Sequence, residues 1–268
     1  LGLREFDLGS DADLVFVAAR GTAREEIVEL TRLAERTIEV LSSYTRDGTV
    51  FAVDTRLRPR GQEGELVVTE DEILGYFRES AHVWEALTYL KAFPVGGNIE
   101  MAREMVSRLN AAVMERFAAF PKLEDELHEM RRRLEREVFV PPSNTKTAPG
   151  GYYDIDFALS YLRLSHRVAM APGTNTAQQV AVLRVAGLIG EEDAGILTQG
   201  SQFLRSVDHA IRLVAGKASE GLPEHVGHVE AVDSLARHWG LVRPGESLGH
   251  RLRETQQQIR YVYRRLVG

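Results

Sequence analysis

The sequence predicts an α+β protein, with a small mixed sheet and packed helices in residues 1–97 and an all-helical bundle in residues 98–268. Two short apolar runs that carry acids, near residues 11–17 and 50–54, have the pattern of strands. After Gly97 the apolar residues recur at helical spacing, and clusters of β-branched residues become rare. These observations indicate two domains with a boundary at residue 97.

The composition is that of an ordinary globular chain, with 44% hydrophobic and 27% charged residues. No apolar run approaches the ~20 residues that cross a bilayer. Cysteine is absent, which fits a reducing compartment. The net charge of -6 argues against broad binding to nucleic acid, whose phosphates attract basic proteins. We therefore expect a cytoplasmic protein that binds neither membranes nor nucleic acid.

The first part of the chain is expected to hold a strand, a helix and a second strand, over residues 13–19, 23–44 and 49–56. Thr22 is a candidate N-cap for the helix, whose apolar residues recur at helical spacing. Asp47-Gly48 is typical of a turn. The second strand would pair beside the first.

An irregular loop, a short strand and a long helix are expected next, over residues 58–64, 66–68 and 70–93. Thr69 and Glu72 have the spacing of a capping box, and Pro94 ends the helix. Trp84 is expected in the core. Glu85 is expected to hold an arginine of the preceding loop.

The second part of the chain is expected to be helical throughout. The predicted helices cover residues 101–117, 123–138, 153–170, 176–185, 191–215, 229–239 and 245–267. Their apolar stripes would form the core of a bundle.

Three acids are candidate metal ligands. Asp11 and Asp13 stand two residues apart in a strand-like run, so their side chains point the same way. Asp54 comes from the run that would pair beside it. Three carboxylates at a sheet end suit hard cations such as Mg²⁺, and this indicates phosphoryl or nucleotidyl chemistry. The alternative is that these acids are solvated turn residues or caps.

Basic residues near glycines are candidate phosphate ligands. Arg56 and Arg58 alternate in extended chain and would form a guanidinium clamp on phosphates or on the target protein, or else a solvated edge with salt bridges. Lys146, followed by Gly150-Gly151, would contact nucleotide phosphate at the start of a helix. The alternative for this loop is a connector in which Asp154 caps the helix.

Three segments resemble the signatures of one family. Residues 1–14 are similar to "G-R-E-L-N-x-G-S-D-x-D-L", residues 53–61 to "V-D-x-R-L-R-P-x-G", and residues 146–157 to "K-x-G-x-G-G-x-x-D-I-E-F". They resemble the glutamine synthetase adenylyltransferase family of the nucleotidyltransferase (DNA polymerase β-like) superfamily. Trp84-Glu85 and Lys91-Ala92 also resemble the "W-E…K-A-R" of this family, with Phe93 in place of the arginine. The chain departs from the family pattern at Asn144, Ala148 and Asp156 as well.

The resemblance implies a nucleotidyltransferase fold for the first domain and roles for its loop residues. Asp11, Asp13 and Asp54 would hold two Mg²⁺ ions and serve as the catalytic acids. Gly9 would let the triphosphate approach the backbone closely, because it lacks a Cβ. Ser10 would add a hydroxyl donor. The chain opens partway into the first signature, so we expect a piece of a longer polypeptide.

The resemblance also implies the reaction. Members of the family transfer AMP from ATP to a tyrosine of glutamine synthetase, and a related half of the same polypeptide removes it with phosphate, releasing ADP. Regulation by a PII signal protein is implied in the same way. These motifs leave the direction of the reaction open.

Two other functions remain open from the sequence. One is an inactive regulatory module that docks glutamine synthetase or PII, and the other is a nucleotidyltransferase with a different acceptor, such as an antibiotic or an RNA end. A zinc site at His225 and His228 is a weak alternative, because Pro223 and Gly227 argue against a regular helix there.

Overall fold

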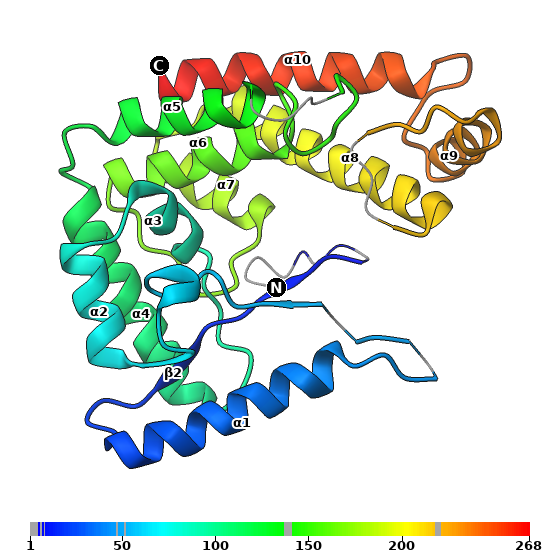
Figure 1. The fold of residues 1–268 in the computed structure, drawn as a ribbon. Helices are drawn as coiled ribbons and strands as arrows, with labels where there is room; N and C mark the ends of the chain where they lie inside the picture. Colours follow the sequence, from blue (N-terminus) through cyan, green and yellow to red (C-terminus); the bar gives the residue numbers. More distant parts are fainter. Residues whose placement is uncertain are drawn as a thin grey trace. The chain divides into compact units, whose positions relative to one another are not determined.

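The computed structural model (Figure 1) describes residues 5, 7, 9–46, 48–50, 52–136, 141–217 and 221–268. The chain divides into two compact units. The first comprises Leu1–Phe117 with Ala171–Gly173, and the second Ala118–Met170 with Thr174–Gly268. The described part is mainly helical with short parallel strands in the first unit, which makes the chain an α+β protein.

The strands of the first unit form two separate parallel pairs. β1 (Ala12–Asp13) pairs with β3 (Val53–Asp54), and β2 (Phe16–Ala18) pairs with β4 (Val67–Thr69). The predicted strand over residues 13–19 is therefore wrong in its extent, because the chain changes partners between β1 and β2. The predicted mixed sheet is also wrong for the described strands, which pair in parallel.

The second predicted strand, over residues 49–56, shortens to β3 in the described part of the chain. Residue 51 of this predicted strand lies outside the described residues, and so does residue 47 of the predicted turn before it. Gly48 has a φ of 101°, which fits the turn prediction at its second residue.

Helix α1 (Arg24–Ser42) follows β2 and confirms the predicted helix. Its buried Ala34 packs with Ala18 and Val67, so one face of α1 covers the β2–β4 pair. The predicted cap is wrong: Ala23 occupies the N-cap position, and the Thr22 hydroxyl donates instead to the carbonyl oxygen of Ala19 at 2.8 Å.

The predicted helix over residues 70–93 is two helices, α2 (Glu70–Glu79) and α3 (Val83–Tyr89). The Thr69–Glu72 capping box is confirmed at the start of α2. A second capping box, formed by His82 and Glu85, starts α3 and so interrupts the helix. Trp84 is 44% exposed, so its predicted place in the core is wrong.

Helix α4 (Ile99–Phe117) packs against α2 and α3 and belongs to the first compact unit. The compact unit therefore extends beyond the change in composition at Gly97. The predicted domains, residues 1–97 and 98–268, divide the chain by composition and stay a prediction.

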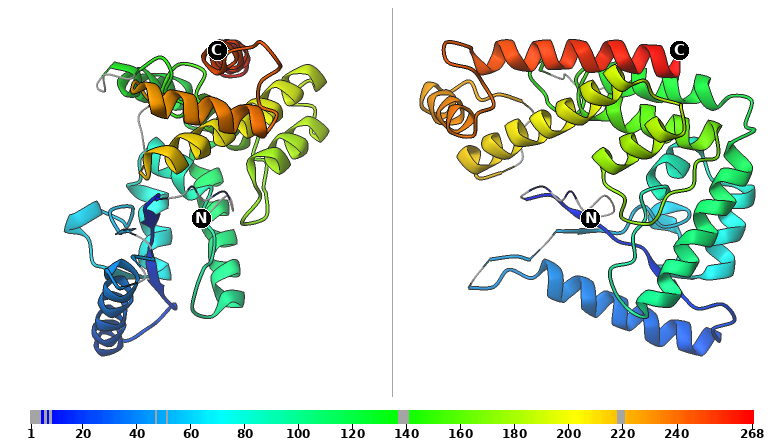
Figure 2. Two further views of the ribbon diagram at one scale, coloured as in Figure 1. Left: turned by 90° about the vertical axis from the view of Figure 1, so that its right-hand side faces the viewer. Right: turned by 180° about the vertical axis from the view of Figure 1, so that it is seen from behind.

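The described part of the second unit consists of helices joined by loops, as Figures 1 and 2 show. The helices are α5 (Leu123–Arg136), α6 (Tyr152–Ser165), α7 (Thr176–Val185), α8 (Glu191–Ala215), α9 (Val226–His238) and α10 (Leu248–Val267). Helix α10 packs along α6 and α8. The buried side chains of Ile155, Leu183 and Leu204 lie in their common core.

The predicted helix boundaries in this unit hold for α7 and α8 and for the start of α5, and they shift for α6, α9 and α10. Helix α6 ends at Ser165 rather than residue 170, because Arg167 has a φ of 54° that a right-handed helix excludes. Helix α9 starts at Val226 and contains Gly227, so the expectation of no regular helix there is wrong. Residues 137 and 138 of another predicted helix lie outside the described part.

Among the described residues, no helix combines the length and the apolar content needed to cross a bilayer.

Candidate functional site

The β1–β3 pair brings two of the predicted acids side by side. Asp13 stands opposite Asp54 in the parallel register, and the backbone N–H of Leu14 donates to the carbonyl oxygen of Asp54 at 2.8 Å. Residues in register on neighbouring parallel strands present their side chains to the same face. Asp11 precedes Asp13 by two residues. The predicted pairing of the two runs is confirmed, whereas the metal-binding role of the three acids stays a prediction.

Asp54 forms an ion pair with Arg56. The backbone N–H of Arg56 donates to Asp54 Oδ1 at 2.8 Å, and its Nε donates to Oδ2 at 2.7 Å. Its terminal Nη2 also donates to Oδ2. The Asp54 side chain is 16% exposed and that of Arg56 is 68% exposed. Both carboxylate oxygens therefore have hydrogen-bond partners: the backbone serves Oδ1, and the largely exposed guanidinium group serves Oδ2.

The ion pair shifts the pKa values of both partners in the direction that favours their charged forms. The hydrogen bond from the Arg56 side chain lowers the pKa of Asp54, partly opposed by burial of the carboxylate. In turn Asp54 raises the pKa of Arg56, with smaller contributions from Asp13 and Asp11. All three acids thus act electrostatically on one guanidinium group.

The three carboxylates fit Mg²⁺ by their donor chemistry but not by their present spacing. Carboxylate oxygens are ligands of the kind that Mg²⁺ prefers. In the described part of the chain, the group of three candidate ligands whose donor atoms all lie within 4.8 Å of one another is a different one, Glu246, His250 and Glu254. The three acids are therefore farther apart than that, and to share a cation they would have to move closer together.

The predicted triphosphate contacts, Gly9 and Ser10, form a turn before β1. Gly9 has a φ of 70°, a conformation that favours glycine. The backbone N–H of Ser10 donates to the carbonyl oxygen of Asp7 at 3.1 Å. The turn lies directly before Asp11. Their contact with nucleotide stays a prediction.

Arg58 organises its own loop. Its Nε donates to the carbonyl oxygen of Gly64 at 2.9 Å, and its Nη1 donates to the carbonyl and hydroxyl oxygens of Thr55 at 2.8 and 2.9 Å. Gly64 is required here, because a Cβ would lie 1.9 Å from the carbonyl oxygen of Pro59. The geometry supports a positioning role for Arg58, and the predicted phosphate clamp stays a prediction.

Two tyrosines, the buried Tyr89 and the half-buried Tyr76, bond to the backbone of this loop. The Tyr89 hydroxyl donates to the carbonyl oxygen of Leu57 at 2.6 Å. The Tyr76 hydroxyl donates to Glu85, at 2.7 Å from Oε1, and accepts from the backbone N–H of Arg60. Glu85 is 3% exposed. The expected pairing of Glu85 with an arginine side chain is wrong, because Tyr76 takes that place and connects Glu85 to the loop through the backbone.

Sequence reasoning missed Tyr76 and Tyr89. The available signal was a glutamate in an apolar helix, which requires a buried donor. Burial together with the hydrogen bond to Glu85 raises the pKa of Tyr76 to about 12. The Tyr76 hydroxyl therefore stays a donor throughout the neutral range.

The loop that carries Lys146 is built rigidly in the second unit. The Asn144 side-chain oxygen accepts from the backbone N–H groups of Lys146 and Thr147, each at 2.8 Å. A Cβ at Gly150 would lie 1.8 Å from the carbonyl oxygen of Gln256. Lys146 itself is exposed, with Nζ 5.4 Å from the centre of the Tyr153 ring. Its contact with phosphate stays a prediction.

Asp154 is a buried anion inside α6 and does not cap the helix, since Gly151 occupies the N-cap position. It is 0% exposed. It accepts from Arg131 Nε at 2.5 Å, from the backbone N–H of Gly150 at 2.7 Å and from Arg260 Nη1 at 3.1 Å. The Arg131 guanidinium also donates to the loop carbonyls of residues 147 and 148, each at 3.0 Å. This network ties the Lys146 loop to α5 and α10.

The two parts of the chain match two family models. Residues 1–108 match glutamate-ammonia ligase adenylyltransferase, and residues 120–267 match GlnD PII-uridylyltransferase. The second match covers the helical unit.

Full-length relatives are similar to most of this chain. The chain is 33% identical over 236 residues to a protein of Streptomyces avermitilis named bifunctional glutamine synthetase adenylyltransferase/adenylyl-removing enzyme, covering 83% of the chain and 23% of that protein. Proteins with the same name from Mycobacterium tuberculosis and Hahella chejuensis are 35% and 31% identical, covering 88% and 84% of the chain. The chain spans 23% and 24% of their lengths.

Replacing Arg56 by alanine is expected to raise the pKa of Asp54 toward its usual value of 3.8, because the main hydrogen bond that lowers it is lost. A depressed pKa in the folded state gives stability that is present above the usual value and lost as pH falls. The wild-type chain should therefore lose this contribution below pH ~4, and the variant should lack it. A carboxyl NMR titration measures the change. Arg32→Ala, on the exposed face of α1, is the control, and an unchanged Asp54 titration in Arg56→Ala would contradict the pairing.

Replacing Tyr76 by phenylalanine is expected to cost about 1–3 kcal/mol of unfolding free energy, because it leaves the buried Glu85 carboxylate short of a donor. Urea denaturation measures the loss. Tyr44→Phe is the control, since Tyr44 is 87% exposed and its hydroxyl should contribute within about 0.5 kcal/mol. Equal stability of the two variants would remove Tyr76 from the support of the loop.

Replacing Arg131 by alanine is expected to cost about 3–5 kcal/mol, because it breaks a buried ion pair and leaves Asp154 with fewer donors. The matched control is Arg132→Ala, whose side chain is 56% exposed and pairs with Glu129 at the surface. That change should cost less than about 1 kcal/mol. Urea unfolding of both variants compares them, and a small effect of Arg131→Ala would show that the network adds little stability.

Proposed function

Because this chain belongs to the glutamine synthetase adenylyltransferase family, we propose that it contains one nucleotidyltransferase unit of such an enzyme. The unit either transfers AMP from ATP to a tyrosine of glutamine synthetase or removes it with phosphate to release ADP. The observation that supports this proposal most directly is the register of Asp13 opposite Asp54, with Asp11 two residues away. The reaction would belong to the control of nitrogen assimilation in the cytoplasm.

Asp11, Asp13 and Asp54 are the residues that would hold two Mg²⁺ ions. When bound, such ions neutralise charge on the entering and leaving oxygens at the reacting phosphorus. Asp54 suits the role of ligand better than that of general base while Arg56 is paired with it, because its lowered pKa makes it a weak proton acceptor. Release of the Arg56 side chain would raise that pKa and free Oδ2, while Oδ1 keeps its bond from the Arg56 backbone N–H.

The remaining residues would bind and orient the nucleotide. The Gly9-Ser10 turn offers backbone and hydroxyl donors directly before the acids. Arg56, once released from Asp54, is an exposed guanidinium group that suits phosphate oxygens. Arg58 keeps the following loop in shape through its bonds to Thr55 and Gly64. Lys146 lies in the second unit on a loop fixed by Asn144, and its contact with phosphate is proposed for that unit by itself.

A second candidate function is an inactive module that docks glutamine synthetase or PII. The engagement of both Asp54 oxygens by Arg56 favours it, because a paired carboxylate is a poorer metal ligand. The two candidates differ in whether Asp54 takes part in chemistry. An enzyme with another acceptor differs from both candidates because it does not need glutamine synthetase.

The test is incubation of the chain with glutamine synthetase, Mg²⁺ and ATP labelled at the α-phosphate, or with pre-labelled glutamine synthetase and phosphate. Label gained by the target indicates transfer, and labelled ADP indicates removal. Asp54→Asn and Asp11→Asn are expected to lower turnover by about 10²-fold or more, because ligands that act in the transition state are lost. Asp71→Asn, a 58% exposed acid that pairs with Arg20, is the control and should retain activity.

Normal turnover in Asp54→Asn would contradict the assignment of the acids. Binding of glutamine synthetase without turnover by the wild-type chain would support the docking module. Turnover of ATP that does not need glutamine synthetase would indicate a different acceptor.

A further inference from the structure

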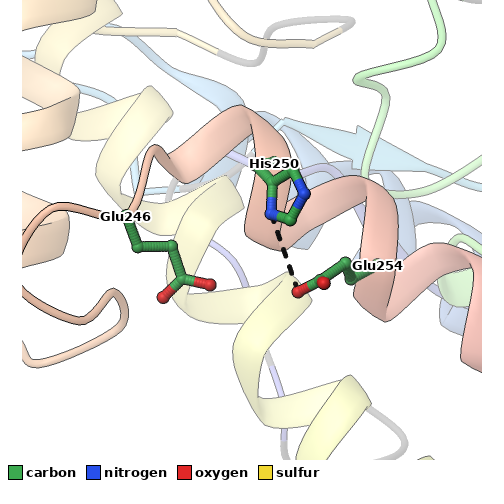
Figure 3. A group of neighbouring side chains, drawn as sticks. All are labelled: Glu246, His250 and Glu254. Atoms are coloured by element: carbon green, nitrogen blue, oxygen red, sulfur yellow. Dashed lines mark ion pairs between the residues drawn. The ribbon is translucent and has the colours of Figure 1, made fainter.

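A second cluster of candidate ligands lies at the start of α10, within the second unit (Figure 3). His250 and Glu254 stand one turn apart on the helix, with His250 Nδ1 3.8 Å from Glu254 Oε2. Glu246 comes from the loop before the helix, and Figure 3 shows its carboxylate on the same side as the other two groups. One donor atom from each residue lies within 4.8 Å of the other two.

We propose that Glu246, His250 and Glu254 bind a divalent cation of the zinc class. An imidazole with two carboxylates is a donor set that Zn²⁺ accepts, with water in the remaining position. Mg²⁺ prefers oxygen ligands throughout, so the imidazole of His250 selects against it. The side chains of His250 and Glu254 are 59% and 46% exposed, which leaves the cation a path from solvent.

The ligands need small movements to close on an ion. Zn²⁺ binds nitrogen and oxygen at about 2.0–2.2 Å, so the donors of a tetrahedral site lie closer together than they do here. Rotation of the exposed side chains at positions 250 and 254 supplies this movement. Glu246 is already oriented, because its Oε2 accepts from the backbone N–H of Arg243 at 3.0 Å.

The Arg251 side chain brings a positive charge close to Glu254. Arg251 Nη1 lies 3.9 Å from Glu254 Oε2, at the limit of an ion pair, and its guanidinium also lies over the Phe203 ring at 5.8 Å. The contact with Phe203 gives Arg251 an alternative position when Glu254 turns to a metal. The two negative carboxylates then balance the two positive charges of the cation, because an imidazole that binds a metal is neutral.

The bound ion would join the turn before α10 to the first turns of that helix. Gly245 has a φ of 82°, and Ser247 caps α10 by accepting from the backbone N–H of His250. This cap uses the backbone, so removal of the His250 imidazole leaves it intact. Because α10 packs along α6 and α8, a cation that binds only the folded chain stabilises the second unit.

The test is isothermal titration of the 268-residue chain with ZnCl₂ alone, in buffer that contains Mg²⁺ and no chelator. We expect one Zn²⁺ per chain and a rise in Tm at saturating metal. His250→Ala and Glu254→Gln should each weaken binding at least about tenfold, since loss of a ligand should cost no less than loss of an outer-shell partner. Circular dichroism checks that both variants fold.

Two controls separate this site from other candidates. His228→Ala removes one of the exposed histidines at positions 225 and 228, whose rings lie 5.2 Å apart, and should leave Zn²⁺ binding unchanged. Asp71→Asn, at an exposed acid outside both proposed metal sites, should also bind Zn²⁺ as the wild-type chain does, so failure of this proposal is distinct from failure of the proposed adenylyl chemistry. The proposal would be overturned if the wild-type chain did not bind Zn²⁺, or if His250→Ala and Glu254→Gln bound it as tightly as the wild-type chain. Loss of binding in His228→Ala would also overturn it.

Discussion

The parallel pairing of β1 with β3 is the constraint on which the first unit depends. Each strand spans two residues, yet their register sets Asp13 opposite Asp54 and leaves Arg56 beside the second acid. A slip by one residue would turn either carboxylate to the opposite face. Such short strands contribute little pairing energy of their own, so the loop that follows β3 must be held by other contacts.

Buried polar networks supply those contacts in both units. In the first unit, Glu85 and two tyrosines hold the loop after Asp54. In the second unit, the buried Arg131 and Asp154 hold the loop that carries Lys146. Each network places a charged group in the interior and satisfies it with donors or acceptors from a loop backbone. The predicted ligand side chains at positions 56 and 146 stay exposed on supports that are themselves fixed.

The sequence predicted the helices well, because apolar spacing, capping residues and Gly or Pro breaks are local signals. The Thr69–Glu72 capping box and helices α7 and α8 were predicted correctly. The strands were predicted poorly, because strand partners lie far apart in the chain. The break between α2 and α3 was missed although its capping box, His82 with Glu85, is local, because His is not a usual N-cap residue. The partner of Glu85 was also missed, since a tyrosine hydroxyl carries no sequence signal of its own.

The tight approach of Gly150 to Gln256 has a consequence for how this sequence can vary. A residue with a side chain at position 150 would collide with the backbone of α10, and the Gln256 side chain in turn donates to the carbonyl oxygen of Asn144 at 2.9 Å. Substitutions in the loop and in the last helix therefore cannot accumulate independently. We expect drift at these distant positions to be correlated across relatives, with the glycine retained wherever the helix keeps its path.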